Sequence, residues 1–335
     1  MAGNGIDLCV ESDLPLNTVL VTGANGFIGS HLIRYLMDSG FDTRAYSRKE
    51  FETDKTAINC KTKWIRGELD SQDRLKEACE GVDAVIHCAG LASSGGSELE
   101  TLLKYNLGGT KNAFYAASNS HVKKFLYLSS LHASLPSVTS YSESKYAAEQ
   151  FLCSHEAVNQ NTQIFILRLA NVYGPGMKGS LLALVQYASL GWLPSLSNLG
   201  GMLSLISIKD LCRSIIMLLD DPYPKHVYKY SLADGQEYSF ERLEEVIYRE
   251  LGRRRPAWAI PSAAFRLIAA GARFANYTGL KNNQFGRRLK YDFINERSYH
   301  DNAFPRLMMA DMTTLENELP EIIASIGLKK VVPKK

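Results

Sequence analysis

The sequence predicts an α/β protein with a doubly wound parallel sheet and a smaller, interleaved second lobe toward the C-terminus. Over residues 17–172, short apolar runs alternate with segments of helical periodicity, the order expected of a parallel sheet covered by helices on both faces. Beyond residue 172 the pattern is less regular, and no linker composition separates it from the first half. A length of 335 residues suits one large unit or two smaller ones.

The first half carries six expected strands, and helical segments follow most of them. The strands are expected at 18–23, 42–48, 63–67, 83–90, 123–130 and 163–174, and the helices at 30–40, 71–81, 98–118 and 141–155. The first helix is supported by Ile28, Leu32 and Leu36, which recur every fourth residue before a glycine stop.

In the second half of the chain, the sequence pattern predicts helices at 178–191, 209–221 and 239–252, and strands at 202–208 and 227–233. Because no linker is evident, we expect the two units to interleave. Residues 17–172 would form the sheet unit with a contribution from 205–235. Residues 173–204 and 236–335 would form the second lobe, and residues 1–16 a loose tail.

Composition excludes several classes of protein. A net charge of +3 is too small to indicate a nucleic-acid surface. Six scattered cysteines without a C-x-x-C pair indicate reduced thiols in a cytoplasmic protein and predict no metal site. The first residues do not resemble a signal peptide, and no run of about 18 uncharged apolar residues predicts a membrane span.

One segment, 253–275, is basic and then apolar. It could lie on a membrane surface or form the floor of a lipophilic pocket. The preferred interpretation is a packing helix of the second lobe.

The stretch "TGANGFIG", residues 22–29, predicts a dinucleotide-binding turn because it follows an expected strand and opens an expected helix. Gly23 would permit the tight turn, Gly26 would let the backbone approach a pyrophosphate, and Gly29 would let the helix pack on the strand. The diphosphate would then meet free backbone N–H groups at the helix N-terminus. The alternative is a glycine-rich helix start that binds no ligand.

The end of the second expected strand bears on the choice of cofactor. An acidic residue there would hydrogen-bond the ribose 2′-hydroxyl of NAD. This strand instead ends in Ser47, Arg48 and Lys49, which suit a 2′-phosphate and favour NADP over NAD. The alternative is that Arg48 and Lys49 form a solvated strand end.

Tyr141 and Lys145 form the main catalytic candidate. At a spacing of four they lie on one face of a helix, where an ammonium beside a phenol favours the phenolate. Ser129 and Ser130 end the fifth expected strand, where α/β sheets place their ligands. The three residue types together indicate proton transfer at a substrate oxygen.

Four motifs give the chain a resemblance to the extended short-chain dehydrogenase/reductases of the NAD-dependent epimerase/dehydratase family. They are "TGANGFIG", "DAVIHCAG", "NLGGTKN" and "RLANVYGPG", and the resemblance covers roughly residues 17–235. It implies a Rossmann core, a C-terminal substrate lobe, hydride transfer to or from a nicotinamide, a small-molecule substrate and a homodimer.

The resemblance also implies residue roles. Tyr141 would be the general acid/base, Lys145 its pKa tuner and ribose anchor, and Ser130 the group that polarises the substrate oxygen, with Ser129 as the fallback. Cofactor contacts are expected from Gly23, Asn25, Gly26, Phe27, Ile28, Gly29, Ser47, Arg48, Glu68, Leu69, Cys88, Ala89, Gly90, Asn106, Ser129, Tyr141 and Lys145. Substrate contacts are expected from Ser130, His132, Asn171 and Leu203. Asn106 could instead be a helix-surface residue and Asn171 a turn residue.

Three departures from the family pattern limit the substrate assignment. Only ten residues separate Ser130 from Tyr141, which suggests a more open site. Leu131 and His132 replace the acidic pair of the sugar dehydratases, which argues against dehydration; His132 is either a substitute acid or, as we prefer, a solvent-facing loop residue. Leu203 stands where many nucleotide-sugar enzymes carry a phosphate-binding arginine, so Lys178, Arg255 or Arg297 serves instead, or the substrate is not a nucleotide sugar.

The sequence therefore favours an NAD(P)-dependent oxidoreductase acting on a secondary alcohol or ketone of a sugar-like substrate. A nucleotide- or polyprenyl-linked sugar epimerase or a 4-ketoreductase would fit. The alternative is a net dehydrogenase or reductase of a lipophilic carbonyl, such as a steroid. A non-catalytic dinucleotide sensor is disfavoured because such proteins lack the tyrosine–lysine pair.

Overall fold

The computed structural model describes residues 16–49, 62–91, 98–136, 139–154, 161–191, 195–196, 202–220, 226–256 and 311–328. The expected α/β fold is confirmed: seven parallel strands form one sheet in the order β3-β2-β1-β4-β5-β6-β9. These strands are β1 (Thr18–Thr22), β2 (Asp42–Ser47), β3 (Lys63–Arg66), β4 (Ala84–His87), β5 (Lys124–Ser130), β6 (Gln163–Leu169) and β9 (Val227–Leu232).

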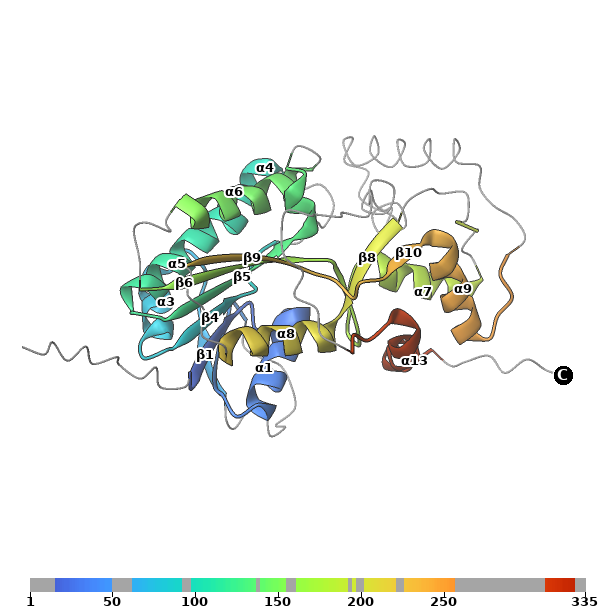
Figure 1. Cartoon of the computed structure of the whole chain (residues 1–335), viewed down its shortest axis with the longest axis horizontal. Coiled ribbons are helices and arrows are strands. Elements are labelled where there is room, and N and C mark those ends of the chain that lie inside the picture. The colour runs from blue at the N-terminus through green and yellow to red at the C-terminus, as the bar shows by residue number, and fades with distance from the viewer. Residues whose placement is uncertain are drawn as a thin grey trace, which may run out of the picture.

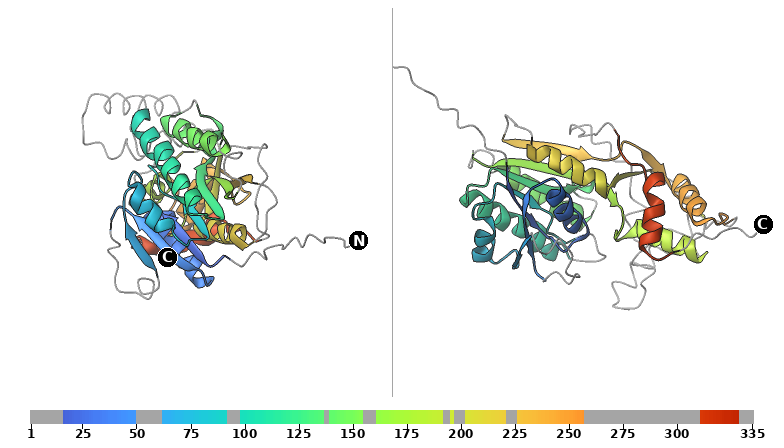
Figure 2. Two further views of the ribbon diagram at one scale, coloured as in Figure 1. Left: turned by 90° about the vertical axis from the view of Figure 1, so that its left-hand side faces the viewer. Right: turned by 90° about the horizontal axis from the view of Figure 1, so that it is seen from below.

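Helices cover both faces of this sheet (Figures 1 and 2). Helices α1 (Phe27–Asp38) and α8 (Ile208–Asp220) pack side by side on one face, and α3 (Gln72–Cys79), α5 (Gly109–Asn119) and α6 (Ser140–Ser154) cover the other. The central strands are accordingly buried on both faces: in β1, Val19, Leu20 and Val21 have no exposed surface.

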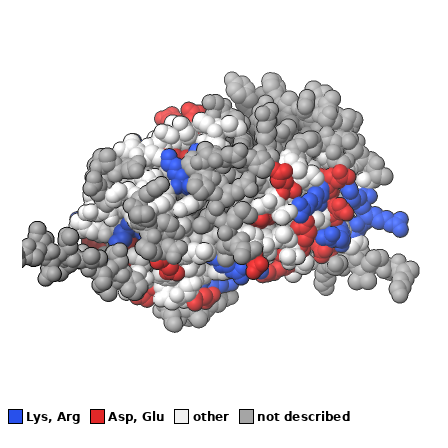
Figure 3. Space-filling model, viewed as in Figure 1, with Lys and Arg blue, Asp and Glu red and all other residues white. Residues whose placement is uncertain are grey.

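The smaller lobe is built on a three-stranded mixed sheet in the order β10-β8-β7. Its elements are β7 (Asn171–Tyr173), β8 (Met202–Ser207), β10 (Glu237–Ser239), α7 (Ser180–Leu190), α9 (Phe240–Leu251) and α13 (Leu315–Ser325). They share an apolar core that includes Tyr173, Tyr238 and Leu319. On the face shown in Figure 3, acidic and basic side chains intermingle over this lobe. Its ion pairs include Arg242–Glu316 and Arg255–Glu244.

The structure differs from the sequence prediction in the segment 163–174, which is two strands and not one. β6 ends at Leu169 in the main sheet, and β7 begins at Asn171 in the small sheet. Between them the Ala170 amide donates to Leu232 O at 2.9 Å, so the break is stabilised by the neighbouring strand β9. The backbone therefore passes from one sheet to the other within a single residue.

The segment 98–118 is helical as expected, but its middle is a π-helix. It runs as α4 (Leu99–Leu102), the π segment Leu103–Gly108 and then α5. Insertions of this kind add one residue to a helical turn and are frequent at functional sites.

Of the segment 205–235, α8 and β9 lie on the main sheet, while β8 belongs to the small one. The exact domain boundaries stay a prediction. The tail 1–15, most of the segment 253–275, and Arg297 lie outside the described residues.

Candidate active site

The turn after β1 requires glycine at Gly23 and Gly29. Gly23 has φ +70°, and a Cβ there would lie 2.8 Å from the Ala89 backbone. A Cβ on Gly29 would collide with Gly23 O, so this glycine lets α1 pack on the end of β1. The amide of Gly26 donates to Gly23 O at 2.8 Å and closes the turn.

A cavity of about 840 Å³, called here the glycine-loop cavity, opens beside this turn. It is lined by Gly23, Asn25, Gly26, Tyr46, Ser47, Arg48, Lys49, Gly67, Glu68, Leu69, Asp70, Cys88, Ala89, Gly90, Leu91, Lys104, Tyr105, Gly108, Gly109, Lys111 and Asn112. Asn25 Nδ2 donates to Ser47 Oγ at 3.0 Å and to Lys49 O at 2.6 Å, which ties the turn to the end of β2. No described residue pairs with the Arg48 guanidinium, which leaves it available to an anionic ligand.

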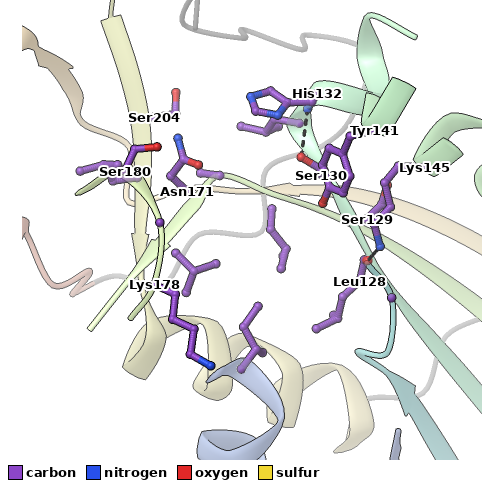
Figure 4. Close-up of a pocket in the computed structure, with 18 of the residues that line it drawn as sticks. Leu128, Ser129, Ser130, His132, Tyr141, Lys145, Asn171, Lys178, Ser180 and Ser204 are labelled. Atoms are coloured by element: carbon purple, nitrogen blue, oxygen red, sulfur yellow. Dashed lines mark hydrogen bonds between the residues drawn. The ribbon is translucent and has the colours of Figure 1, made fainter. Parts of the chain in front are cut away.

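A second cavity of about 360 Å³, the tyrosine cavity, adjoins the first and shares Cys88, Gly90 and Leu91 with it. Its lining combines residues of both lobes: Ile28, Cys88, Gly90, Leu91, Leu128, Ser129, Ser130, Leu131, His132, Tyr141, Lys145, Leu169, Ala170, Asn171, Val172, Lys178, Gly179, Ser180, Leu181, Leu203, Ser204 and Leu205. Figure 4 shows Tyr141 next to Ser130 on one wall, with Asn171, Ser180 and Lys178 facing them.

Lys145 is buried at the base of the tyrosine cavity, with 7% of its surface exposed. Its Nζ donates to Leu128 O at 2.8 Å and lies 4.7 Å from the centre of the Tyr127 ring. Burial lowers the pKa of Lys145 to about 8, although Cys88 and Glu149 act in the opposite direction. Since an ammonium carries three N–H donors and the described residues accept one, the others can reach a ligand in the cavity.

The two serines at the end of β5 have different partners. Ser130 Oγ accepts from the His132 amide at 3.2 Å and keeps its own proton available in the tyrosine cavity. Ser129 Oγ donates to Glu149 Oε1 at 2.5 Å. The geometry therefore favours Ser130 as the serine that meets a substrate oxygen.

His132 does not face solvent as the preferred interpretation of the sequence held. A 3₁₀ turn (Leu131–Ser134) directly follows β5 and turns the ring to the wall of the tyrosine cavity, where it is partly buried. Burial lowers the pKa of His132, which favours the neutral imidazole.

Asn106 lies in the π segment and is 1% exposed, so it is not a helix-surface residue. Its Oδ1 accepts from the Leu91 amide at 2.7 Å, and its Nδ2 donates to Ser144 Oγ at 2.9 Å. It thus connects the loop after β4 to helix α6. Asn106, Phe27 and Gly29 do not line either cavity, whereas the other predicted site residues do.

The wall from the smaller lobe contains Asn171, Leu203 and Lys178. Leu203 is 2% exposed and packs in the lobe core, so it presents only an apolar surface. Lys178 lies on the loop 174–179, which the contact between His31 Nε2 and Pro175 O (3.0 Å) holds against α1. No described residue pairs with the Lys178 ammonium, whereas Arg255 pairs with Glu244 and lines neither cavity.

Sequence reasoning missed several lining groups. Tyr46, Asp70, Lys104, Tyr105, Lys111 and Asn112 line the glycine-loop cavity, and Ser180 and Ser204 line the tyrosine cavity. Lys111 and Asn112 belong to the motif "NLGGTKN", a signal that could have found them, whereas the other six belong to none of the quoted motifs. The described ranges contain no group of three His, Cys, Asp or Glu side chains placed to hold a metal, and every helix in them is too short or too polar to cross a bilayer.

Comparison with known proteins shows the family and the fold of the chain. The chain is similar to UDP-glucose 4-epimerase of Vibrio cholerae (27% identity; 76% of this chain and 81% of the relative). It is also similar to the decarboxylating sterol-4-alpha-carboxylate 3-dehydrogenase of Dictyostelium discoideum (23%; 68% and 74%).

Among solved structures, gox2253 matches with a TM-score of 0.72 (22% identity; 93% of this chain and 98% of that one). UDP-glucose 4-epimerase from Bifidobacterium longum, in complex with NAD+ and UDP, matches with a TM-score of 0.62 (23%; 73% and 86%). The family model for "NAD dependent epimerase/dehydratase family" matches residues 19–231, well over half of the chain. This chain therefore belongs to the NAD-dependent epimerase/dehydratase family and is an enzyme of the short-chain dehydrogenase/reductase type.

Proposed function

We propose that this enzyme uses NADP to oxidise a secondary alcohol, or to reduce a ketone, on a sugar-like ring. The observation that carries the proposal is the junction of the two cavities. Tyr141, Lys145 and Ser130 line a cavity that shares Cys88, Gly90 and Leu91 with the glycine-loop cavity. A dinucleotide that extends from the glycine turn through this junction would bring its nicotinamide beside the tyrosine.

The residues fit a dinucleotide. The cradle at Gly23 has no room for a Cβ, as expected where a backbone must approach a pyrophosphate. Ser47, Arg48 and Lys49 would surround the adenosine ribose, and the positive charge of Arg48 and Lys49 supports NADP over NAD. Glu68 and Leu69 line the same cavity and would contact the adenine.

In the reaction, Tyr141 would exchange a proton with the substrate oxygen, and Ser130 would hydrogen-bond the same oxygen. Lys145 would stabilise the phenolate by its charge and anchor the ribose with its remaining N–H donors. Bound NADP supplies the hydride acceptor, and NADPH the donor, at the substrate carbon. In oxidation the substrate hydroxyl gives its proton to Tyr141 and the substrate carbon would give its hydride to the nicotinamide; in reduction both transfers run in reverse. Tyr141 therefore acts as general base in oxidation and as general acid in reduction.

Epimerisation requires both half-reactions in sequence, with the hydride returned to the opposite face of the ring. A net reductase or dehydrogenase performs only one of them. Asn171, Ser180 and Ser204 provide polar groups that suit the hydroxyls of a sugar, and Lys178 would contact an anionic group of a nucleotide- or polyprenyl-linked sugar.

A second candidate is reduction or oxidation of a lipophilic carbonyl. Leucine side chains from both lobes, including the buried Leu203 and Leu205, supply much of the tyrosine cavity, and they favour an apolar ring. The similarity to a sterol dehydrogenase points the same way.

One assay separates these candidates. The protein is incubated with NADP or NADPH and with UDP-glucose, other nucleotide sugars or a sterol, while absorbance of the reduced nicotinamide is followed. Stoichiometric gain or loss of NADPH identifies a dehydrogenase or reductase and excludes an epimerase. Interconversion of sugar epimers without net NADPH change identifies an epimerase. If the protein binds neither NADP nor NADPH and turns over none of these substrates, the proposal is contradicted.

A further inference from the structure

Glu149 is a buried carboxylate beside the candidate active site that the proposed mechanism does not use. It lies on α6, one turn after Lys145, and 2% of its surface is exposed. Its Oε1 accepts from Ser129 Oγ at 2.5 Å and from Arg168 Nε at 3.0 Å, while Oε2 accepts from Arg168 Nη2 at 2.8 Å. Arg168 is itself 6% exposed, so the ion pair is desolvated on both sides.

The two partners of Glu149 lie on neighbouring strands at the same level. Ser129 of β5 and Arg168 of β6 are paired across the parallel ladder. One carboxylate therefore fastens helix α6 to the carboxyl ends of two adjacent strands. Replacing either partner would leave a buried polar group unpaired, which would lower the free energy of unfolding. This cost favours a single, fixed arrangement of the three side chains.

Three successive residues of β5 contact α6 at this level. The ring of Tyr127 faces Lys145 Nζ, the carbonyl of Leu128 accepts from the same nitrogen, and the hydroxyl of Ser129 donates to Glu149. Ser130, next in the strand, lines the tyrosine cavity. Since successive side chains of a strand point in opposite directions, Ser129 is engaged by Glu149 while Ser130 points elsewhere, into the tyrosine cavity next to Tyr141.

We infer that Glu149 is a positioning residue for the reaction, because through Ser129 and Arg168 it holds α6 on the ends of β5 and β6. Lys145 Nζ then keeps its hydrogen bond to Leu128 O, and Ser130 is the serine that contacts the substrate. The inference rests on the proposed function, because it assigns Glu149 a role in the Tyr141–Lys145–Ser130 site.

Glu149 also affects the charge of Lys145. Burial lowers the pKa of Lys145, and Glu149 is one of the groups that raise it. The other titratable or charged groups around this nitrogen are Tyr141 on α6, Tyr127 on β5, and His87 and Cys88 at the end of β4, with Arg168 behind Glu149. Removing the negative charge of Glu149 leaves Lys145 and Arg168 as uncompensated cations, so Lys145 should lose its proton at a lower pH.

The chain offers a matched control. Glu244 in the smaller lobe is 1% exposed and, like Glu149, accepts from a serine and an arginine: Ser195 Oγ at 3.0 Å and Arg255 Nη2 at 3.1 Å. It lines neither cavity. Glu244→Gln therefore removes a buried charge from the same kind of cluster without touching the site.

The test is a fluorescence titration of the full-length protein with NADPH from pH 6 to 10, in wild type, Glu149→Gln and Glu244→Gln. For wild type, affinity should fall as pH rises past the pKa of Lys145, about 8. In Glu149→Gln this decline should move to lower pH, by about one unit, which makes binding about threefold weaker midway between the two midpoints and roughly tenfold weaker at a pH well above both. Glu244→Gln should keep the wild-type profile.

The outcomes separate the two proposals. A wild type that binds neither NADPH nor NADH overturns the proposed function and the role of Glu149 together. A wild type that binds NADPH, with the same pH profile in Glu149→Gln as in wild type, overturns the role of Glu149 alone. An equal shift in Glu244→Gln also overturns it, because the effect would then be general to buried charges.

Because Glu149→Gln can prevent folding, Ser129→Ala provides a milder second variant that keeps the ion pair. With a substrate found in the assay above, Ser129→Ala should lower kcat about threefold to tenfold with little change in KM, as expected from loss of one hydrogen bond. Ser130→Ala should lower kcat about a hundredfold or more. The inference is overturned if kcat is unchanged in Ser129→Ala, or if kcat falls as far in Ser129→Ala as in Ser130→Ala.

Discussion

The two cavities that meet at Cys88, Gly90 and Leu91 are built in different ways. The glycine-loop cavity is formed by turns at the ends of β1 to β4 and by the π segment, all from the first part of the chain. The tyrosine cavity needs both lobes, since Tyr141 and Ser130 come from the main sheet unit and Lys178 and Leu203 from the smaller lobe. Under the proposed function, cofactor binding would therefore depend on local motifs, and substrate choice on how the lobes pack.

The largest expected effect separates chemistry from binding. Tyr141→Phe removes only the phenolic hydroxyl, so turnover should fall by about 10² to 10⁴ while NADPH affinity stays within about twofold of wild type. Steady-state rates and NADPH fluorescence measure the two quantities. Tyr146→Phe, on the same helix but lining neither cavity, is the control and should keep full turnover. Retained turnover in Tyr141→Phe would remove tyrosine from the mechanism.

Gly23→Ala should damage the glycine-loop cavity selectively. The new Cβ would sit at a positive φ and 2.8 Å from the Ala89 backbone, which costs roughly 1–3 kcal/mol and distorts the turn. We expect lower unfolding free energy in urea and weaker NADPH binding. Gly40→Ala has the same sign of φ (+89°) but open space around it, so it should lose some stability and keep NADPH affinity. Equal affinities in the two variants would mean that the turn does not hold the cofactor.

Arg48→Ala tests the choice of cofactor. Loss of a charge-assisted contact to the 2′-phosphate should weaken NADPH binding by about tenfold to a hundredfold and leave NADH binding nearly unchanged. Arg66→Ala, at the end of the neighbouring strand β3 and outside the cavity, should change neither. A parallel loss of NADPH and NADH affinity in Arg48→Ala would contradict a role in phosphate recognition.

Lys178→Met probes the smaller lobe. If Lys178 contacts an anionic group of the substrate, KM should rise about tenfold with little change in kcat, and Lys178→Arg should recover most of the loss. Lys76→Met, on the exposed surface of α3, is the control for charge removal. An unchanged KM in Lys178→Met would favour a neutral, lipophilic substrate.

The same division explains what could be predicted from the sequence. The glycine turn and the Tyr141–Lys145 pair are local patterns, and the structure contains both in the expected elements. The break at Ala170 could not be predicted, because both sides of it are apolar and extended and only the pairing with Leu232 separates them. The ion pair between Glu149 and Arg168 joins a helix to a strand, and neither residue's sequence context indicates the other.

Predictions about the second lobe were weaker for a related reason. Strand β10 has only three residues, and Pro320 lies inside α13 and interrupts its helical pattern, so the sequence predicted neither element. The position of His132 depends on the 3₁₀ turn after β5, which the sequence does not mark.

The passage of the backbone from β6 to β7 within one residue has a thermodynamic consequence. Where the described part of the chain passes between the lobes at residues 169–171 and 232–237, it is held by backbone hydrogen bonds: the Asp234 amide donates to Leu205 O, and the Ala170 amide donates to Leu232 O. Unfolding of one sheet would remove hydrogen-bond partners from the edge of the other, so the two sheets should unfold cooperatively. Calorimetry should then record a single heat-absorption peak, and a substitution deep in the smaller lobe should lower the melting temperature of the whole molecule.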